Sequence, residues 1–516
     1  MRIHVGFTIL SLFFLSFMLP ECSPSTIQGW CSQTPHPQPC QHFIMMKNHS
    51  NHHNSFAVFQ QMTKQIALDQ ALKTQRQTIW LRPNSQNIRE KAAWADCIHL
   101  FGNTIHRLKQ TIGNHGQHTD EDVQTWLSSA LTNLDTCQTG FTELGVSSNI
   151  LPLLSNVSKL VTNALATNKY TLSQKNKEHK IPTWRPLDEK KVLQDLNIPD
   201  IVVAKDGSGN FTNVQEAVDY ASKMQRKRKD SRFVMYVKVG IYEENVEIGW
   251  AGKNITMVGD GIGKTIITAS RSVKKHSTTY TSATVAVDGD GFMARDMTFR
   301  NSAGPSNGQA VALRSGSDLS AFYRCSFEGY QDTLYVHSNK QFFRECDIYG
   351  TVDFIFGNAA AVFQNCNIYS DTVHTPNAVT AQGRTDSNQT TGIVIQSCRV
   401  RAFTAAGRSP LPRKAMKTYL GRPWKKYSRT IFIKTYFDGS VDPAGWMKWD
   451  KDFALNTLYY GEYKNRGSGS STAKRVKWGG FHLITSSLEA SNYTVSSFIS
   501  GGSWLPSLGV PFTPGL

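Results

Sequence analysis

The spacing of apolar residues divides the chain into two regions. In residues 55–170, apolar side chains recur every three or four positions in four stretches, and each stretch predicts an amphipathic helix. The two most regular faces consist of Trp94, Cys97, Ile98, Phe101, Ile105, Leu108 and Ile112, and of Val123, Trp126, Leu127, Ala130, Leu134, Cys137 and Phe141. Four such helices with short connections predict an all-α four-helix bundle.

Residues 200–458 follow a different pattern. Apolar runs of about five to seven residues alternate with Gly, Asn and Asp, which predicts short strands separated by turns. The short sequence that begins at Phe322 is repeated at Phe342 and Phe363 and, less closely, at Ile395. The long apolar faces that a helix pair would need at this period are missing, so the repeat predicts an all-β solenoid, a parallel β-helix.

The remaining segments have the composition of targeting and connecting sequences. Arg2 and His4 precede an apolar run at residues 5–19, which predicts a secretory signal and is too short for a comfortable membrane span. Residues 167–199 are polar, basic and rich in proline, and so predict a linker. We therefore expect a signal peptide at 1–23, a bundle domain at 24–170, a linker at 171–198 and a β-helix domain at 199–516.

Secretion makes disulfide bonds available to the nine cysteines. Cys22 is expected to leave with the signal or to lie beside the cut, which leaves an even number. In the helical region we expect the pairs Cys31–Cys40 and Cys97–Cys137. The strand region holds Cys325, Cys346, Cys366 and Cys398. Their near-regular spacing leaves the pairing open, and of the possible pairs we favour Cys346 with Cys366.

The charge balance indicates a polyanionic partner. The formal net charge is +17, and the aromatic residues lack the pattern of an RNA-binding domain, so we do not expect a nucleic-acid partner. For a secreted basic protein, an acidic polysaccharide is the natural partner. N-glycosylation motifs occur at Asn48, Asn156, Asn210, Asn254, Asn388 and Asn492.

Two aspartates share the solenoid period. Asp332 and Asp353 are 21 positions apart, and so are Cys325 and Cys346. Stacked strands lie about 4.8 Å apart, so residues one period apart become neighbours on one face. Two carboxyls held that close should have one pKa raised and the other lowered, which would provide an acid and a nucleophile. The alternative is that both aspartates are ordinary turn residues.

Five motifs in a fixed order resemble the plant pectin methylesterases, or pectinesterases. They are GIYEE at 240–244, QAVAL at 309–313, QDTL at 331–334, DFIFG at 353–357 and LGRPW at 420–424. Residues 24–170 resemble the pectin methylesterase inhibitor domain that often precedes the enzyme, including the spacing of its two cysteine pairs. The resemblance implies a right-handed parallel β-helix that hydrolyses the methyl esters of homogalacturonan in the cell wall.

The resemblance also assigns roles to single residues. It implies that Asp353 is the nucleophile, which forms an acyl-enzyme, and that Asp332 is the proton donor and later the base. It implies that Gln309 and Gln331 stabilise the transition state as uncharged donors, and that Arg422 holds Asp353 ionised.

Family analogy further places aromatic side chains along the substrate cleft. Sugar rings stack on aromatic planes. The residues assigned to this role are Trp424, Tyr335, Phe356 and Trp446. The assignment of Trp446 is the weakest of the four, because Trp449 lies close to it in the sequence. Gln309 and Arg422 are expected to bind substrate as well. No CxxC or HxxxH cluster is present, so we expect neither a metal nor a cofactor.

The sequence allows more than one interpretation of the processing motif and of the function. Lys190, Lys191, Val192 and Leu193 depart from the family's basic-Leu-Leu processing motif, and a solvated charge run is the simpler interpretation of the two lysines. We expect a secreted monomer that a protease can cleave at this motif. The alternatives are another pectin-active β-helix enzyme, either a lyase or a polygalacturonase, and an inactive wall-binding or inhibitor protein.

Overall fold

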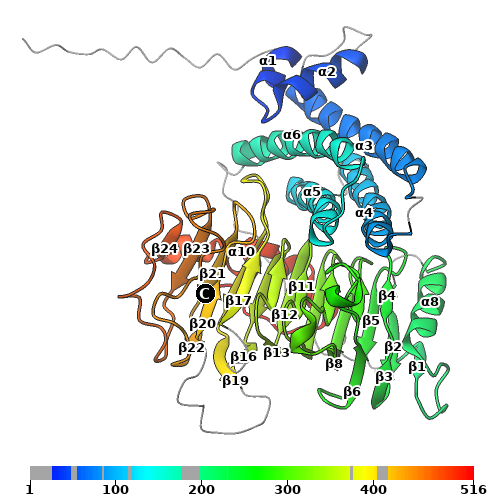
Figure 1. Cartoon of the computed structure of the whole chain (residues 1–516), viewed down its shortest axis with the longest axis vertical. Coiled ribbons are helices and arrows are strands. Elements are labelled where there is room, and N and C mark those ends of the chain that lie inside the picture. Colours follow the sequence, from blue (N-terminus) through cyan, green and yellow to red (C-terminus); the bar gives the residue numbers. More distant parts are fainter. Residues whose placement is uncertain are drawn as a thin grey trace, which may run out of the picture.

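The computed structural model consists of a helical bundle that lies on one side of a long β-solenoid (Figure 1). It describes residues 26–47, 55–83, 86–113, 118–175, 198–228, 231–371, 376–403 and 417–516. The expected signal peptide, most of the expected linker and the lysines at 190 and 191 therefore lie outside the described residues. Among the helices of these ranges, none combines the length with the hydrophobicity that a membrane span requires.

The four expected long helices are confirmed. They are α3 (Phe56–Trp80), α4 (Ile88–Ile112), α5 (Asp120–Glu143) and α6 (Leu151–Lys175). Thr119 begins α5 with a capping box to Asp122, which satisfies backbone donors that a helix start leaves free. Helix α6 continues to Lys175, which is five residues into the range expected to be linker.

Two short helices, which the sequence pattern did not predict, precede the bundle. Helix α1 (Ile27–Ser32) and helix α2 (Pro37–Lys47) are joined by the disulfide Cys31–Cys40. The second expected disulfide, Cys97–Cys137, links α4 to α5. Both bonds were expected, and both are confirmed.

The solenoid is built from two parallel sheets. The smaller sheet contains β4 (Val246–Ile248), β7 (Val285–Val287), β9 (Leu313–Ser315), β11 (Leu334–Val336), β14 (Ile355–Gly357), β17 (Asn377–Gln382) and β20 (Thr418–Gly421). The first part of the larger sheet contains β1 (Ile201–Val203), β2 (Phe233–Val237), β3 (Gly240–Glu243), β5 (Ile255–Val258), β6 (Thr265–Ala269), β8 (Met293–Asn301), β10 (Ser320–Glu328), β12 (Lys340–Arg344) and β13 (Asp347–Gly350). It continues with β15 (Ala360–Gln364), β16 (Asn367–Asp371), β18 (Gly392–Gln396), β19 (Arg399–Phe403), β21 (Arg429–Ile433), β22 (Tyr436–Phe437), β23 (Tyr459–Tyr463) and β24 (Phe481–Leu483).

Each middle coil bends once within the larger sheet. Glu345 separates β12 from β13 and Asn365 separates β15 from β16, and both residues have a positive φ, of 53° and 56°. Phe322, Phe343 and Phe363 stack inside the solenoid, at 4.8 and 4.4 Å between ring centroids, because their strands pair in register. Helix α8 (Val214–Gln225) packs against the first coils, while α9 (Ser487–Ser491) and α10 (Val495–Ile499) follow the last strand.

The four cysteines of the solenoid are free and buried, so the favoured pair Cys346–Cys366 is wrong. The strands that flank them pair in register, which places Cys325, Cys346, Cys366 and Cys398 on successive coils. Parallel strands in register hold equivalent Cβ atoms about 4.8 Å apart, whereas a disulfide needs about 3.5–4.5 Å. The thiols point to carbonyl oxygens instead, as Cys346 Sγ does to Phe322 O at 3.4 Å.

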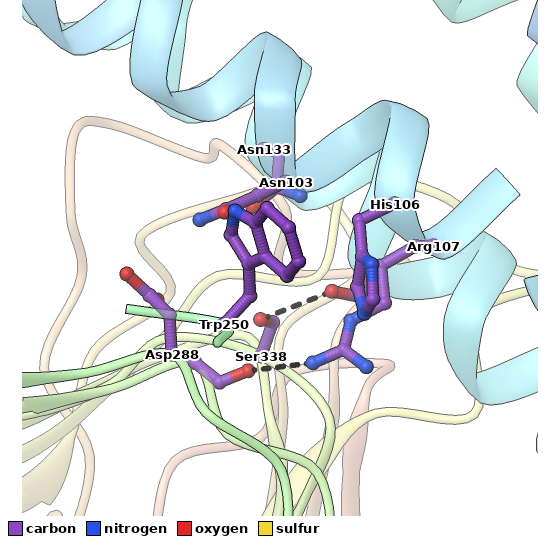
Figure 2. Close-up of a pocket in the computed structure, with 9 residues that line it drawn as sticks. Asn103, His106, Arg107, Asn133, Trp250, Asp288 and Ser338 are labelled. Atoms are coloured by element: carbon purple, nitrogen blue, oxygen red, sulfur yellow. Dashed lines mark hydrogen bonds between the residues drawn. The ribbon is translucent and has the colours of Figure 1, made fainter. Parts of the chain in front are cut away.

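The bundle contacts the solenoid through polar side chains and through an apolar cluster that includes Tyr280 and Val311 of the solenoid. Helices α4 and α5 face the side of the smaller sheet (Figure 1). Arg107 of α4 donates to both carboxylate oxygens of Asp290 and to the carbonyl of Gly316. Beside it, the ring of His106 stacks on Trp250 at 5.4 Å (Figure 2). The hollow lined by these side chains has a volume of about 10 Å³, which is close to that of a single water.

Candidate active site

The two candidate catalytic aspartates lie on neighbouring coils. Asp332 stands two residues before β11 and Asp353 two residues before β14, and these strands pair with Leu334 opposite Ile355. The backbone N–H of Asp332 donates to the carbonyl of Val352 at 3.1 Å, which joins the two turns. Both aspartates have a positive φ, of 62° and 54°, a strained conformation that Asp tolerates and that is common at functional sites.

Arg422 binds one of the two carboxylates. It follows β20, and its Nε and one terminal nitrogen donate to Asp353 at 2.8 and 2.7 Å, which is a bidentate geometry. Its guanidinium also lies over the ring of Trp449, at 4.4 Å from the centroid. The arginine is therefore fixed between a carboxylate and an aromatic plane.

The carboxyls differ in acidity, although not quite as expected. Burial raises the pKa of both, and at Asp332 the negative charges of Asp353 and Glu143 raise it further. At Asp353 the hydrogen bonds and charge of Arg422 oppose the effect of burial. We expected one pKa to be lowered, but burial outweighs Arg422. The pair still holds its proton on Asp332 and its charge on Asp353, because only Asp353 is bound by a cation.

Gln309 and Gln331 line the same cavity as the aspartates. Gln331 immediately precedes Asp332, and its carbonyl accepts a hydrogen bond from the N–H of Ala310 at 3.2 Å, which ties the two glutamines' segments together. Neither side-chain amide has a hydrogen-bond partner among the residues that the structure describes. Both amides are therefore available as donors to a bound oxygen atom.

Three of the expected aromatic residues form one cluster in the cavity. Tyr335 stacks on Phe356 at 4.2 Å, and Trp424 meets Phe356 edge to face at 5.9 Å. A Cβ at position 383 would lie 2.7 Å from the indole of Trp424, so Gly383 leaves the space that this ring needs.

The fourth expected aromatic residue, Trp446, is not in the cavity. It is 1% exposed, stacks on Tyr460 in the solenoid core at 4.1 Å, and its Nε1 donates to Glu462. Trp449, three positions later, lines the cavity instead and is 37% exposed. The sequence predicted that an aromatic residue of this loop lines the cavity. Because a loop has no regular repeat of inward and outward positions, the sequence could not show which of the two tryptophans points into the cavity.

The bundle forms the other wall of the cavity. The space measures about 340 Å³, and besides the residues above it is lined by Thr136, Thr139, Gly140, Thr142 and Glu143 of α5. Glu143 accepts hydrogen bonds from the N–H and hydroxyl groups of Thr279. The motifs gave no sign of this wall, because its contacts join residues more than a hundred positions apart.

A third group of contacts holds α5 along the smaller sheet. Trp126 Nε1 donates to Asp318 at 2.8 Å, and Lys340 and Lys425 of the solenoid bind Asp122 and Asp135 at 2.8 and 3.0 Å. Within the described ranges, no group of three His, Cys, Asp or Glu side chains is arranged to hold a metal ion. The cavity brings together three carboxyls, one guanidinium and two amides, which belong to Glu143, Asp332, Asp353, Arg422, Gln309 and Gln331.

Comparison with known families matches both regions of the chain. The family model described as Pectinesterase matches residues 200–502, and that described as Plant invertase/pectin methylesterase inhibitor matches residues 25–167. The chain is 54% identical to Pectinesterase 2 of Citrus sinensis over 519 residues, which covers 100% of both proteins. It is 51% identical to a probable pectinesterase/pectinesterase inhibitor 17 of Arabidopsis thaliana, covering 99% of this chain and 98% of that protein.

Solved structures resemble the chain over its larger region. A pectin methylesterase from carrot is 54% identical, with a TM-score of 0.59, and the match covers 62% of this chain and 99% of that one. A pectin methylesterase from Aspergillus niger is 30% identical, with a TM-score of 0.51, over 60% of this chain and 97% of its own. These matches agree with the parallel solenoid.

Proposed function

Since the chain belongs to the pectinesterase family, and so hydrolyses the methyl esters of pectin to methanol and demethylated pectin, we propose that Asp353 and Asp332 carry the reaction. The single observation that supports these roles is the position of Arg422. Its guanidinium binds Asp353 with two hydrogen bonds, which leaves Asp332 as the carboxyl that keeps a proton.

The reaction proceeds in two steps. In the first, a carboxylate oxygen of Asp353 attacks the C6 carbonyl carbon of a galacturonate methyl ester, the bond to the methoxy oxygen breaks, and Asp332 gives its proton to the departing methanol. In the second, Asp332 takes a proton from water, and the resulting hydroxide attacks the galacturonyl carbon of the anhydride. The products are a free galacturonate and the original carboxylate of Asp353.

Gln309 and Gln331 donate to the oxyanion that develops in each step. Their amides line the cavity without protein partners, and an uncharged donor does not form a salt bridge with the aspartates. Tyr335, Phe356 and Trp424 hold the sugar rings on either side of the reacting ester.

Methanol release from highly esterified pectin by residues 199–516 tests these roles. A fragment of this length is reasonable, because the carrot enzyme folds with a chain that matches 62% of this one. Asp353→Asn should abolish release, and Asp332→Asn should reduce it by several orders of magnitude, while both variants still bind pectin. Full activity of Asp353→Asn would overturn the mechanism. New chain ends without methanol would indicate a lyase or polygalacturonase instead.

The bundle restrains the enzyme in the uncleaved chain. This second role is supported by the wall that α5 forms over the catalytic residues, since Thr136, Gly140 and Glu143 line the same cavity as the two aspartates. The protein is then a secreted monomer of the cell wall that gains activity when a protease cuts the linker. Residues 24–175, expressed separately, should bind the 199–516 fragment and slow its methanol release. A bundle that neither binds nor inhibits would exclude this role.

A further inference from the structure

Lys425 is a cation of the solenoid whose ion-pair partner belongs to the bundle. Its Nζ lies 3.0 Å from the carboxylate of Asp135 on α5, and it also donates to the hydroxyl of Thr139 at 3.4 Å. Among the residues that the structure describes, Asp135 is the only carboxylate with which Lys425 forms an ion pair. The undescribed segments 372–375 and 404–416 contain no Asp or Glu. When the bundle leaves, the ammonium group of Lys425 therefore loses its counter-charge.

Two other cations at the same face differ from Lys425 in this respect. Arg422 is bound by a carboxylate of the solenoid itself, through two hydrogen bonds. Lys340 also binds the bundle, but its own backbone N–H donates to the carboxylate of Asp318 at 3.1 Å. An acidic group of the solenoid therefore remains beside Lys340 when the bundle has left, whereas Lys425 becomes available for another anion.

The backbone of the solenoid holds Lys425 beside the catalytic cavity. The residue before it, Trp424, lines that cavity, and the Nζ of Lys425 lies 5.2 Å from the centroid of the Trp424 ring. The carbonyl of Lys425 accepts from the N–H of Ser428 at 3.1 Å, which closes a turn. The N–H of Tyr427 donates to the carbonyl of Arg384 at 3.0 Å. No bond that fixes this turn comes from the bundle, so the turn keeps its place after the bundle has left.

The bundle indicates which chemical group fits this position. Asp135 places a carboxylate next to the aromatic ring on which a sugar of the substrate stacks. In a galacturonate unit the carboxyl group is attached directly to the sugar ring, so a unit stacked on Trp424 can present that group to the flexible side chain of Lys425. A demethylated unit is negatively charged at this group and is attracted by the ammonium, whereas a methyl ester is neutral.

From this geometry we propose that Lys425 forms a carboxylate subsite, which in the released enzyme binds a demethylated galacturonate unit of the polymer whose ester is being hydrolysed. The subsite rests on the proposed function, because its ligand is a unit of the same substrate, but Lys425 takes no part in the reaction. In the uncleaved chain Asp135 occupies the subsite and imitates the charge of that unit. The released enzyme then favours an ester that lies beside a free galacturonate over one within a fully esterified stretch.

Methanol release by residues 199–516 tests the subsite with two substrates. One is a fully methyl-esterified galacturonate hexamer, and the other is the same hexamer after mild alkali has removed some of its esters. Expressed per ester, the KM of the parent should be about two- to fivefold lower for the partly de-esterified hexamer, which is the range of an exposed ion pair. Lys425→Gln should remove this difference without changing kcat, and Lys425→Arg, which keeps the charge, should restore it.

Lys426→Gln is the matched control. It removes the same charge from the next position, which is exposed and lies over the ring of Tyr427 at 5.4 Å. Both KM values should stay as in the parent. If a general attraction between a basic protein and a polyanion caused the preference, the variants at 425 and 426 would behave alike.

A binding measurement separates this proposal from the catalytic one. The fully acidic hexamer contains no ester, so calorimetric titration of residues 199–516 measures the subsite without the reaction, whether or not Asp353 and Asp332 carry it. Lys425→Gln should weaken this binding about two- to fivefold. The proposal is overturned if the parent shows no preference in KM, if Lys425→Gln, with an unchanged melting temperature, keeps that preference or the parent's affinity for the acidic hexamer, or if Lys426→Gln has the same effects.

Discussion

Arg107 of the bundle and Asp290 of the solenoid form a two-pronged ion pair, with nitrogen to oxygen distances of 2.8 and 2.6 Å. The arginine side chain is 4% exposed, and it also donates to the carbonyl of Gly316. The two residues are 183 positions apart, so this contact exists only when the bundle is docked. It lies outside the catalytic cavity, and can therefore be changed without touching the active site.

Arg107→Ala should release the bundle and raise the activity of the uncleaved chain. Removing one partner leaves the carboxylate of Asp290 without its cation, which weakens docking by roughly 3 kcal/mol, a more than hundredfold shift. Methanol release by the full chain should then approach that of residues 199–516. Lys109→Ala, at an exposed position two residues later on α4, is the matched control and should change nothing. If the uncleaved Arg107→Ala chain releases methanol as slowly as the parent, the Arg107–Asp290 pair does not keep the bundle docked on the enzyme.

Docking should also depend on pH through Asp96. Burial raises the pKa of this carboxyl to about 7, while a hydrogen bond from Thr278 and the charges of Arg314 and His99 lower it and Glu143 raises it. Its usual value is near 3.8, so the docked state binds a proton that the released state gives up. Docking is then strongest below pH 4, weakens about tenfold per pH unit from 4 to 7, and levels off above 7.

Asp96→Asn tests this dependence, because the amide stays neutral at every pH. The ratio of full-chain to fragment activity should rise between pH 5 and 7 in the parent and much less in the variant. Asp122 faces Lys340, which helps to lower the pKa of that carboxyl, so it stays ionised across this window and does not mask the effect. Identical pH profiles for parent and variant would contradict the assignment to Asp96.

Local periodicity in the sequence was sufficient to predict the fold and the proximity of Asp332 and Asp353. The helical faces around Phe101 and Leu127 identified α4 and α5, and the 21-residue interval placed Asp332 beside Asp353 because the strands pair in register. Arg422 could be named only through the family motif, since no spacing rule connects it to a turn 69 residues earlier.

The wrong disulfide and the wrong tryptophan were predicted where sequence spacing does not determine the direction in which a side chain points. The interval from Cys346 to Cys366 correctly made them neighbours, but it contains no information on the Cβ separation that a disulfide requires. Trp446 and Trp449 could not be told apart, because no regular period tells which side chain in their loop turns inward. The wall that α5 forms over the cavity depends on the fit between the surfaces of two domains. A local sequence pattern contains no information on that fit, so the wall could not be predicted.

The cysteine stack predicts four free thiols in the solenoid. Alkylation of native residues 199–516 should label none of them, since all four are buried, and alkylation after denaturation without reductant should label all four. Mass spectrometry counts the adducts directly. In the chain without the expected signal peptide at 1–23, which contains Cys22, the count should stay the same, because Cys31, Cys40, Cys97 and Cys137 are in disulfides. A peptide cross-linked between Cys346 and Cys366 would contradict the structure.

Trp449 should act as a positioning residue for Arg422. The guanidinium lies 4.4 Å from the indole centroid, and a contact of this kind contributes about 0.5–2 kcal/mol. In residues 199–516, Trp449→Ala should lower kcat roughly two- to thirtyfold. It should also shift the acid limb of the pH profile to higher pH. A loosely held Arg422 no longer opposes the effect of burial, so the pKa of Asp353 rises. Trp449→Phe keeps an aromatic plane and should restore most of the activity. Phe453→Ala, at a 41% exposed position in the same loop, should leave kcat and the pH profile unchanged. A purely structural role for Trp449 would lower the yield of folded protein without moving the acid limb, and that result would refute the positioning role.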